Sequence, residues 1–296
     1  MITNVLPVSS ASRFVLPARW KSTFKMSSEK KLTRLKKIIA RLGSVLVAFS
    51  GGVDSVFLLK VASLVLPKDK ILAATAHSAT YPKEELLFSK KIAKALGIRH
   101  KVIQTYELEN KRFVSNSFNR CYFCKKELFS RLKDIAKVKK LNFVVDASNV
   151  SDQRDFRPGN KAKKEGKIRS PLEEAGLTKE DIRILSKKLG LITWNKPTMA
   201  CLASRIPYGI KISSNILARI NKAEGFLRRL GFKEVRSRHY NGLCRIEVSR
   251  DDIPKLISKR SAIVGRLKRC GYNYITVDLE GYRTGSMNEL LVEKKQ

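Results

Sequence analysis

The fold class is decided by the stretch Val45-Leu46-Val47-Ala48-Phe49-Ser50-Gly51-Gly52-Val53-Asp54-Ser55. An apolar strand at Val45–Phe49 runs into two glycines, and a helical pattern continues from Val56 to Leu66 and stops at Pro67. A strand, a glycine turn and a helix in this order predict the first half of a βαβ unit. The turn is either a plain connection or a phosphate-binding loop, because glycines allow close approach of an anion and the helix start offers free N–H groups.

Apolar runs and helical patterns alternate on either side of this stretch. The sequence predicts helices at Leu32–Leu42, Pro82–Leu96 and Tyr122–Val138 and strands at Ile71–Ala76, Lys101–Gln104 and Asn142–Asp146. Strands that alternate with helices predict an α/β fold, with a parallel sheet covered by helices on both faces. We assign residues 28–205 to this first domain.

The second half of the chain has a different order of elements. Residues 147–176 and 193–212 are rich in turn-forming and charged residues, which predicts two long functional loops around a helix at Thr178–Leu189. The sequence then predicts a helix at Ser213–Leu230, strands at Glu234–Arg238 and Arg245–Val248, a helix at Asp251–Arg269 and a strand at Tyr274–Val277. This order predicts a small α+β domain over residues 206–296, which we expect to bind substrate or to form oligomer contacts.

The composition limits the kinds of partner. No apolar run approaches the ~20 residues needed to cross a bilayer, so we expect no membrane association. The formal net charge of +35, from 61 basic and 26 acidic residues, attracts polyanions. Nucleic-acid binding and a lysine-coated surface are the two interpretations. The sequence contains no zinc-finger spacing and no RNA-recognition motif, which favours the lysine-coated surface.

Residues 1–27 are treated as an N-terminal extension. Residues 1–28 contain no acidic residue but several Ser, Thr, Arg and Lys, a composition typical of an organellar transit segment. Met26 is a second plausible start, so a short disordered tail is the alternative interpretation. Five cysteines, an odd number, in a chain without a recognisable secretory signal indicate a reducing compartment. We expect a cytoplasmic protein, with organellar targeting as the alternative.

The residues of the glycine turn suit a nucleotide with its metal. Ser50 and Ser55 add hydroxyl donors to the main-chain groups of Gly51 and Gly52. Asp54 would repel a bare phosphate, so its carboxylate is expected to act through Mg²⁺. The chain has neither the G-x-x-x-x-G-K-[ST] nor the G-x-G-x-x-G pattern, which excludes the two commonest nucleotide-binding fingerprints.

The cysteines allow more than one interpretation. Cys121 and Cys124 are spaced as half of a metal or cluster site, but no second C-x-x-C exists, so two buried thiols at a helix start are favoured. Cys201 lies in an irregular segment near an arginine, where a lowered thiol pKa is one interpretation and a structural role the other. Cys244 and Cys270 fit a strand and a helix pattern and are interpreted as structural.

Two charged clusters are further candidates. The segment 146–152 follows a predicted strand, and loops at the carboxyl ends of parallel strands are common ligand sites; Asp155–Gly159 extends this cluster. Arg236 and Arg238 alternate on a predicted strand, so they point to the same side and suit a phosphate or a carboxylate. A solvated surface is the alternative for both clusters.

Five ordered segments, taken together, resemble the LarE family of ATP-dependent sacrificial sulfur transferases, which belong to the PP-loop ATP pyrophosphatases. The segments are Ala48–Ser55, Asn119–Lys125, Ser148-Asn149 with Asp155–Gly159, Ala200–Arg205 and Asp278–Asn288. The resemblance covers the chain from about residue 29. It implies a PP-loop domain similar to the adenine nucleotide alpha hydrolases, and it implies that the turn at Ser50–Ser55 binds ATP and Mg²⁺.

The resemblance also implies a reaction. A carboxylate of pyridinium-3,5-biscarboxylic acid mononucleotide attacks the α-phosphate of ATP, and the Cys201 thiolate then displaces AMP. Loss of the Cys201 α-proton releases the sulfur as a thiocarboxylate and leaves dehydroalanine. The product contributes to the nickel-pincer nucleotide cofactor of lactate racemase.

The same resemblance implies roles for other residues. Arg236 and Arg238 would hold the substrate phosphate, Glu224 is a candidate for the proton step, and the chain would assemble as a hexamer. Family members with an iron–sulfur cluster use additional cysteines, so a cluster held by Cys201 and Cys244 is the alternative to a single turnover. A tRNA thiolase or an amide-forming synthetase is the competing enzyme class, and a non-catalytic nucleotide sensor or nucleic-acid binder is the competing binding function.

Overall fold

The computed structural model describes residues 26–154, 158–197 and 200–288. Four parallel strands form the larger sheet in the order β3-β2-β1-β4, and three strands form the smaller sheet in the order β5-β6-β7. The strands are β1 Val45–Ala48, β2 Ile71–His77, β3 Arg99–Gln104, β4 Phe143–Val145, β5 Val235–Tyr240, β6 Leu243–Val248 and β7 Tyr274–Val277. The prediction of an α/β fold with a parallel sheet is therefore confirmed.

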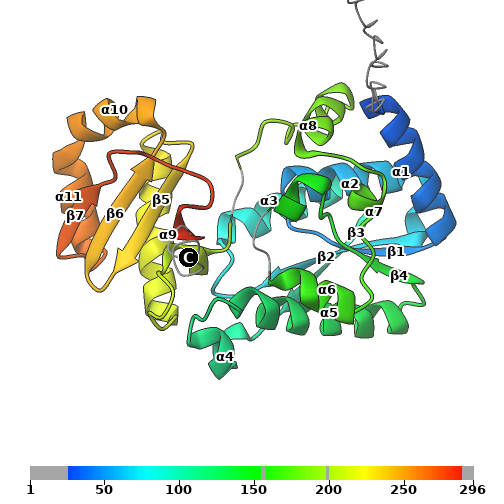
Figure 1. Ribbon diagram of the computed structural model, residues 1–296, viewed down its shortest axis with the longest axis horizontal. Coiled ribbons are helices and arrows are strands. Elements are labelled where there is room, and N and C mark those ends of the chain that lie inside the picture. Colours follow the sequence, from blue (N-terminus) through cyan, green and yellow to red (C-terminus); the bar gives the residue numbers. More distant parts are fainter. Residues whose placement is uncertain (1–25, 155–157, 198–199, 289–296) are drawn as a thin grey trace, which may run out of the picture.

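Helices occupy both faces of the larger sheet, as Figure 1 shows. The α-helices are α1 Ser28–Leu42, α2 Val53–Val65, α3 Lys83–Ala95, α4 Lys111–Val114, α5 Arg120–Val138, α6 Gly159–Glu165, α7 Pro171–Glu174, α8 Lys179–Lys188, α9 Ser214–Arg229, α10 Ile253–Ser258 and α11 Arg260–Arg269. Short 3-10 helices lie at Lys68–Lys70, Glu107–Glu109, Val150–Arg154, Leu202–Arg205, Arg250–Asp252 and Ser286–Asn288. The helices α5 and α6 pack on one face of the sheet, and α1, α2, α7 and α8 pack on the other.

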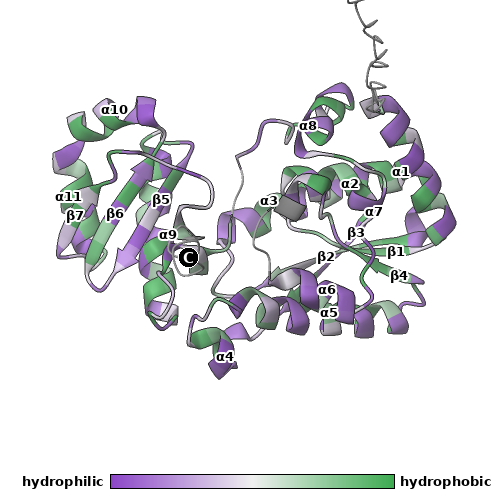
Figure 2. Cartoon of the chain, viewed as in Figure 1, coloured by the Kyte–Doolittle hydropathy of each residue, from purple (hydrophilic) through white to green (hydrophobic). Residues whose placement is uncertain are grey.

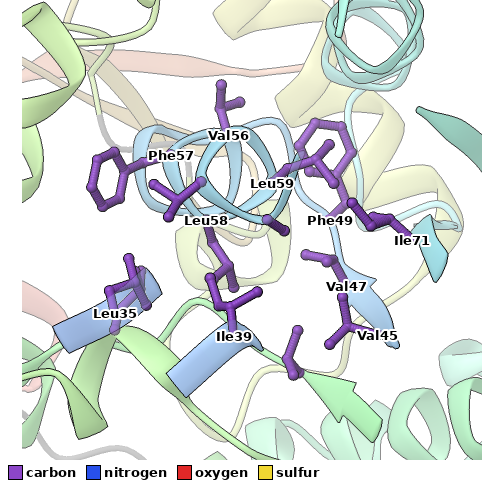
Figure 3. Packing of buried hydrophobic residues seen from close by; sticks show 14 of the residues in the cluster. Leu35, Ile39, Val45, Val47, Phe49, Val56, Phe57, Leu58, Leu59 and Ile71 are labelled. Atoms are coloured by element: carbon purple, nitrogen blue, oxygen red, sulfur yellow. The ribbon is translucent and has the colours of Figure 1, made fainter. Parts of the chain in front are cut away.

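Alternation along the strands explains the two cores. Val45 and Val47 point to the side of α1 and α2, where Leu35, Ile39 and Phe57 also pack (Figure 3). Leu46 points to the other side, into the core under α5 and α6. Successive side chains of a strand face opposite sides, so one short apolar run contributes to both layers.

Helix α1 shows how the surface layer is built. Leu32, Leu35, Ile39 and Leu42 recur at helical spacing and are buried, and Figure 2 shows hydrophilic and hydrophobic residues alternating along this helix. The hydroxyl of Ser27 caps the helix start by accepting from the main-chain N–H of Lys30. Ser27, which belongs to the predicted extension, therefore supports this helix, whereas residues 1–25 lie outside the described part.

The smaller sheet has a core of its own. In it β5 and β6 are antiparallel, and β6 and β7 are parallel. Helices α9 and α11 contribute Leu227, Ile263 and Leu267 to a cluster that also contains Phe232 and Tyr272. The 3-10 helix at Leu202–Arg205 lies beside the predicted boundary between residues 205 and 206, and this boundary stays a prediction.

Two predicted segments differ from the structure. The segment 147–176 was expected to be irregular, but its described part contains α6 and α7. Each is shorter than the roughly 11 residues over which a helical pattern can be recognised in a sequence. The helix expected at Asp251–Arg269 is divided into α10 and α11, because Lys259 leaves helical geometry with φ −97° and ψ 12°.

Candidate functional site

The glycine turn lies at the carboxyl end of β1, in the middle of the larger sheet. From β1 the chain continues to β2 and β3 on one side, and it returns to β4 on the other side. The order of the strands therefore reverses between β1 and β4, and open parallel sheets bind ligands at such a reversal. The turn Ser50–Ser55 and the loop after Val145 both reach this edge.

Gly51 needs to be glycine for two reasons. Its φ is +67°, a conformation that L side chains rarely adopt, and a Cβ would lie 3.1 Å from the Cβ of Ser89. The carbonyl of Ser50 accepts a hydrogen bond from the Tyr81 hydroxyl at 2.7 Å. The turn is thus held in a fixed shape from outside by the segment that follows β2.

The turn leaves donors available for an anion. Helix α2 begins after Gly52 and has no side-chain cap, so its first N–H groups are not claimed by a side chain. The hydroxyls of Ser50 and Ser55 lie 3.2 Å apart at the same place. A helix start with free N–H groups and nearby hydroxyls is suited to bind phosphate.

Asp54 extends from the first turn of α2. One of its oxygens, Oδ2, lies 2.5 Å from the Nζ atom of Lys179 at the start of α8. The other oxygen, Oδ1, is buried and has no partner among the described residues. A buried carboxylate oxygen without a donor fits a ligand to a cation, because Mg²⁺ prefers oxygen ligands.

Two lysines at the turn were not found from the sequence. Lys179 pairs with Asp54, and the Nζ atom of Lys196 donates to the carbonyl of Gly51 at 3.2 Å and pairs with Glu85 at 2.7 Å. Both lysines come from segments more than a hundred residues away in the sequence. In a chain with 61 basic residues, nothing in the sequence distinguishes these two lysines from the others.

The loop after β4, predicted as a ligand site, also reaches this edge. Asp146 accepts hydrogen bonds from the hydroxyls of Ser148 and Ser170, at 2.7 and 2.6 Å. Ser151 accepts from the main-chain N–H of Lys179, so this loop packs beside the lysine that holds Asp54. Residues 155–157 of the same predicted cluster lie outside the described residues.

Cys201 lies just before the 3-10 helix at Leu202–Arg205. The main-chain N–H of Leu202 donates to the carbonyl of Thr80 at 3.0 Å. The guanidinium of Arg205, which is fully buried, donates to the carbonyls of Ala200 and Cys201 at 2.7 and 3.1 Å. Because Thr80 precedes the tyrosine that contacts Ser50, the cysteine segment and the glycine turn share one support.

The residue Cys201 is exposed to solvent, but protein atoms surround its thiol closely enough for burial to dominate the thiol's pKa. Burial raises the pKa of this thiol above its ordinary value, and Cys121 acts in the same direction. The N–H of Ala203 and the side chains of Thr80 and Arg120 oppose the rise without cancelling it. The thiol therefore forms less thiolate at neutral pH than a free cysteine does.

Cys121 and Cys124 lie in the first two turns of α5, beside the Cys201 segment. Cys121 is exposed and Cys124 is half-buried, so the expectation of two buried thiols is wrong for Cys121. Cys124 packs against the apolar cluster that contains Leu202, and its Sγ atom lies 3.7 Å from a carboxylate oxygen of Glu107. Burial, followed by the charge of Cys201, raises the pKa of the Cys124 thiol.

Arg236 and Arg238 are buried on β5 and already have partners. Arg238 forms a two-pronged ion pair with Glu247, at 2.8 and 2.6 Å, and donates to the carbonyl of Ser204 at 2.8 Å. Arg236 lies over the ring of Tyr282. Burial lowers the pKa of Arg236, and the nearby charge of Arg205 adds to this effect. The contact of Arg238 with Ser204 places this pair beside the Cys201 segment.

Glu224 is fully buried on α9 and all its hydrogen-bonding capacity is used. Arg205 binds both of its oxygens, at 2.7 and 2.9 Å, and Arg228 and the main-chain N–H of Ser237 bind them as well. Burial alone would raise the pKa of its carboxyl, but the arginines, led by Arg205, outweigh burial and hold it below the usual range. A low pKa makes a weak base, so this geometry favours an anchor for Arg205. The predicted part in the proton step stays a prediction.

Cys244 lies inside the core of the smaller sheet and is fully buried. Burial raises the pKa of its thiol to about 12. Within residues 26–154, 158–197 and 200–288, no three His, Cys, Asp or Glu side chains are arranged to hold a metal ion.

Comparison with known proteins tests the resemblance. The chain is 37% identical over 252 residues to pyridinium-3,5-bisthiocarboxylic acid mononucleotide synthase of Lactiplantibacillus plantarum, covering 85% of this chain and 91% of that protein. The chain belongs to the LarE family. The family assignment made from the five segments is therefore confirmed, although no protein-family model matches the chain.

Two further relatives are named as uncharacterized proteins. An uncharacterized protein of Synechocystis is 41% identical over 267 residues, covering 90% of this chain and 99% of that protein. An uncharacterized protein of Methanocaldococcus jannaschii is 30% identical over 258 residues, covering 86% and 98% respectively. As for membranes, none of the helices in the described part of the chain has both the length and the apolar character to span one.

Proposed function

We propose that the chain is an ATP-dependent sulfur transferase. It would adenylate a carboxylate of pyridinium-3,5-biscarboxylic acid mononucleotide and convert it to a thiocarboxylate with the sulfur of Cys201, for the nickel-pincer nucleotide cofactor of lactate racemase. The observation that carries the proposal is the place of Cys201, an exposed residue whose segment is bound to Thr80, next to the tyrosine that contacts the glycine turn. The named synthase among the relatives supports it.

The first step takes place at the glycine turn. A carboxylate oxygen of the substrate attacks the α-phosphorus of ATP, the bond to the β-phosphate breaks, and pyrophosphate leaves. The free N–H groups of α2 and the hydroxyls of Ser50 and Ser55 bind the phosphates. Asp54 would hold Mg²⁺ with its unpartnered oxygen, and the ion would offset the charge of the phosphates.

The second step moves sulfur. The thiolate of Cys201 attacks the acyl carbon and AMP leaves with its electron pair, which gives a thioester. Loss of the Cys201 α-proton then breaks the bond between Cβ and sulfur. The electron pair stays on sulfur, so the products are a thiocarboxylate and dehydroalanine in the chain. Arg236 and Arg238 would bind the substrate phosphate in competition with Glu247.

Intact mass spectrometry tests the proposal. The purified protein is incubated with ATP, Mg²⁺ and the biscarboxylated pyridinium nucleotide, and Cys270→Ala serves as a control that removes a different thiol. Wild type and control should lose the mass of one H₂S, mapped to residue 201, whereas Cys201→Ala should release pyrophosphate without any mass loss. Release of AMP by wild type at unchanged mass would instead assign the sulfur to another source, such as a cluster.

Two further features belong to the proposal. We propose a homohexamer, which light scattering on the full chain would measure directly. We also propose that the basic surface does not bind nucleic acid. Binding of tRNA whose affinity survives at physiological salt would contradict this and would favour a tRNA thiolase.

A further inference from the structure

A buried carboxylate that the proposed reaction does not use lies beside the cysteines of α5. Glu107 belongs to the 3-10 helix Glu107–Glu109 and is 5% exposed. Its Oε1 atom accepts a hydrogen bond from the Thr105 hydroxyl at 3.1 Å and another from the Sγ atom of Cys124 at 3.7 Å. Its Oε2 atom is buried and has no hydrogen-bond partner within the described residues. Glu107 therefore keeps an oxygen that can take up a proton without losing a hydrogen bond.

The main chain fixes this carboxylate against α5. The N–H of Tyr106 donates to a carboxylate oxygen of Glu127 on α5 at 2.9 Å. The N–H of Thr105 donates to the carbonyl of His77, at the end of β2, at 3.2 Å. The two residues that precede Glu107 are thus bound to a helix and to a strand, so its side chain has a fixed place beside α5.

Cys124 connects Glu107 to Cys201. It packs against the apolar cluster that contains Leu202, the residue after Cys201. Burial is the largest cause that raises the pKa of the Cys124 thiol, and the charge of Cys201 comes next, ahead of that of Glu107. A thiol can both donate and accept a hydrogen bond. Cys124 can therefore receive a proton from Cys201 and pass its own proton to Glu107.

Two other side chains act on these thiols through their charges. Arg120 is buried, and its charge favours the thiolate of Cys201. Cys121 is exposed and adds to burial in raising the pKa of both thiols. A guanidinium cannot accept a proton, and an ordinary thiol is mostly protonated at neutral pH. Among the groups that act on Cys124 and Cys201, the carboxylate is therefore the one suited to accept a proton.

We propose that Glu107 and Cys124 take up the proton of Cys201 as its sulfur attacks the acyl-adenylate. The proton of Cys201 passes to the sulfur of Cys124, and the proton of Cys124 passes to the carboxylate of Glu107. The sulfur of Cys201 forms its bond to the acyl carbon while AMP leaves with its electron pair. Glu107 becomes neutral, Cys124 is a thiol again, and the negative charge leaves with AMP. This inference rests on the proposed function and supplies the base for its second step.

Single-turnover kinetics of the full-length protein, with ATP, Mg²⁺ and the biscarboxylated pyridinium nucleotide, test the proposal. Pyrophosphate release follows the first step, and loss of sulfur from residue 201 follows the second. Glu107→Gln should leave pyrophosphate release unchanged and slow the sulfur loss about 100-fold or more at pH 7. The difference from wild type should shrink above about pH 9, where hydroxide replaces the missing base. Glu109→Gln is the matched control, because it removes an exposed carboxylate from the same 3-10 helix.

Two variants of Cys124 test the relay without changing Glu107. Cys124→Ser keeps a group that can donate and accept, and it should lose sulfur at least about tenfold faster than Cys124→Ala. Equal rates in these two variants, or a deficit of Glu107→Gln that is the same at every pH, would overturn the relay while the proposed function stands. Wild-type protein that releases pyrophosphate but keeps its sulfur would overturn both.

Discussion

Asp54 and Glu224 are both carboxylates that face basic side chains, but their surroundings are opposite. The side chain of Asp54 is 22% exposed, one oxygen pairs with Lys179, and the other has no partner within the described residues. The side chain of Glu224 is 0% exposed. It accepts hydrogen bonds from two arginines and from one main-chain N–H. Asp54 therefore keeps one oxygen for a ligand, whereas both oxygens of Glu224 are used in hydrogen bonds that stabilise the fold.

The difference teaches how to interpret the other charged groups. Arg238 resembles Glu224, because Glu247 and Ser204 already occupy its guanidinium. A substrate phosphate would have to share Arg238 with Glu247 or replace it. The start of α2 needs no such exchange, since its first N–H groups carry no side-chain cap. We therefore expect changes at the turn to affect activity and changes in the buried network to affect stability.

The largest expected effect is on stability, for Glu224→Gln. This change leaves Arg205 buried without its counter-charge, which costs about 3–5 kcal/mol of the free energy of unfolding. Denaturant unfolding measures it, with exposed Glu234→Gln as the matched control. Because the pKa of Glu224 is lowered on folding, its contribution is present above the ordinary value of 4.5 and is lost as the pH falls below it. A Glu224→Gln protein that is as stable as wild type but inactive would contradict this prediction and would indicate a catalytic role for Glu224.

Asp54→Asn comes next and should affect activity alone. We expect AMP formation to fall about 100-fold or more, because the amide is a poor ligand for Mg²⁺. The free energy of unfolding should change by less than about 1 kcal/mol, since the pair with Lys179 is partly exposed. AMP release in single-turnover experiments and denaturant unfolding give the two numbers. Activity that survives this change would exclude Asp54 as the metal ligand.

Lys179→Met also tests whether Asp54 binds Mg²⁺, and its expected effect on activity is smaller than that of Asp54→Asn. Without the lysine, Mg²⁺ no longer competes with an ammonium group for Asp54. The half-saturating concentration of Mg²⁺ should therefore fall a few fold, equivalent to about 0.2–1 kcal/mol. A Mg²⁺ titration of AMP formation measures it, and Lys188→Met is the control on the same helix, where the lysine pairs with Glu29. An unchanged titration would mean that the lysine and the metal do not compete.

The smallest expected effect concerns the pH dependence of the Cys201 thiol. Its pKa is raised above the ordinary value of 9.0, so less thiolate is present at neutral pH than in a free cysteine. Alkylation of residue 201 by iodoacetamide should be slower than that of free cysteine at pH 8, and its rate should keep rising above pH 9. Peptide mapping follows the site alone. A rate that levels off below pH 8 would show that the thiolate is stabilised instead.

The elements that the sequence predicted well are those that depend on local patterns of residues. The strand, glycine turn and helix at Val45–Leu66 are set by neighbouring residues, and alternation of elements was enough to predict the parallel sheet. Short helices such as α6 were missed, because the seven residues of α6 are fewer than the roughly 11 needed to recognise a helical pattern. Their stability comes from packing, as when Ala162 enters the core under α5.

The site could be predicted only in part, because it depends on contacts between segments that are distant in the sequence. The sequence marked Asp54, but only folding brings Lys179 to it across 125 positions. It marked Cys121 and Cys124 without their neighbour Glu107, which approaches Cys124 because both flank the apolar cluster of Leu202. It marked Glu224 without its partner Arg205, which lies on the other side of the predicted domain boundary.

The hold of Arg205 on the Cys201 segment has one more consequence. This arginine donates hydrogen bonds to the main-chain carbonyls of Ala200 and Cys201, and these bonds do not involve the thiol. Under the proposed function, a copy that has given up its sulfur would therefore keep the same loop and the same junction with α9. Used and unused copies would look alike to a protease or a chaperone that senses loosened structure, so spent copies would accumulate beside fresh ones, and both would compete for ATP and for places in any assembly.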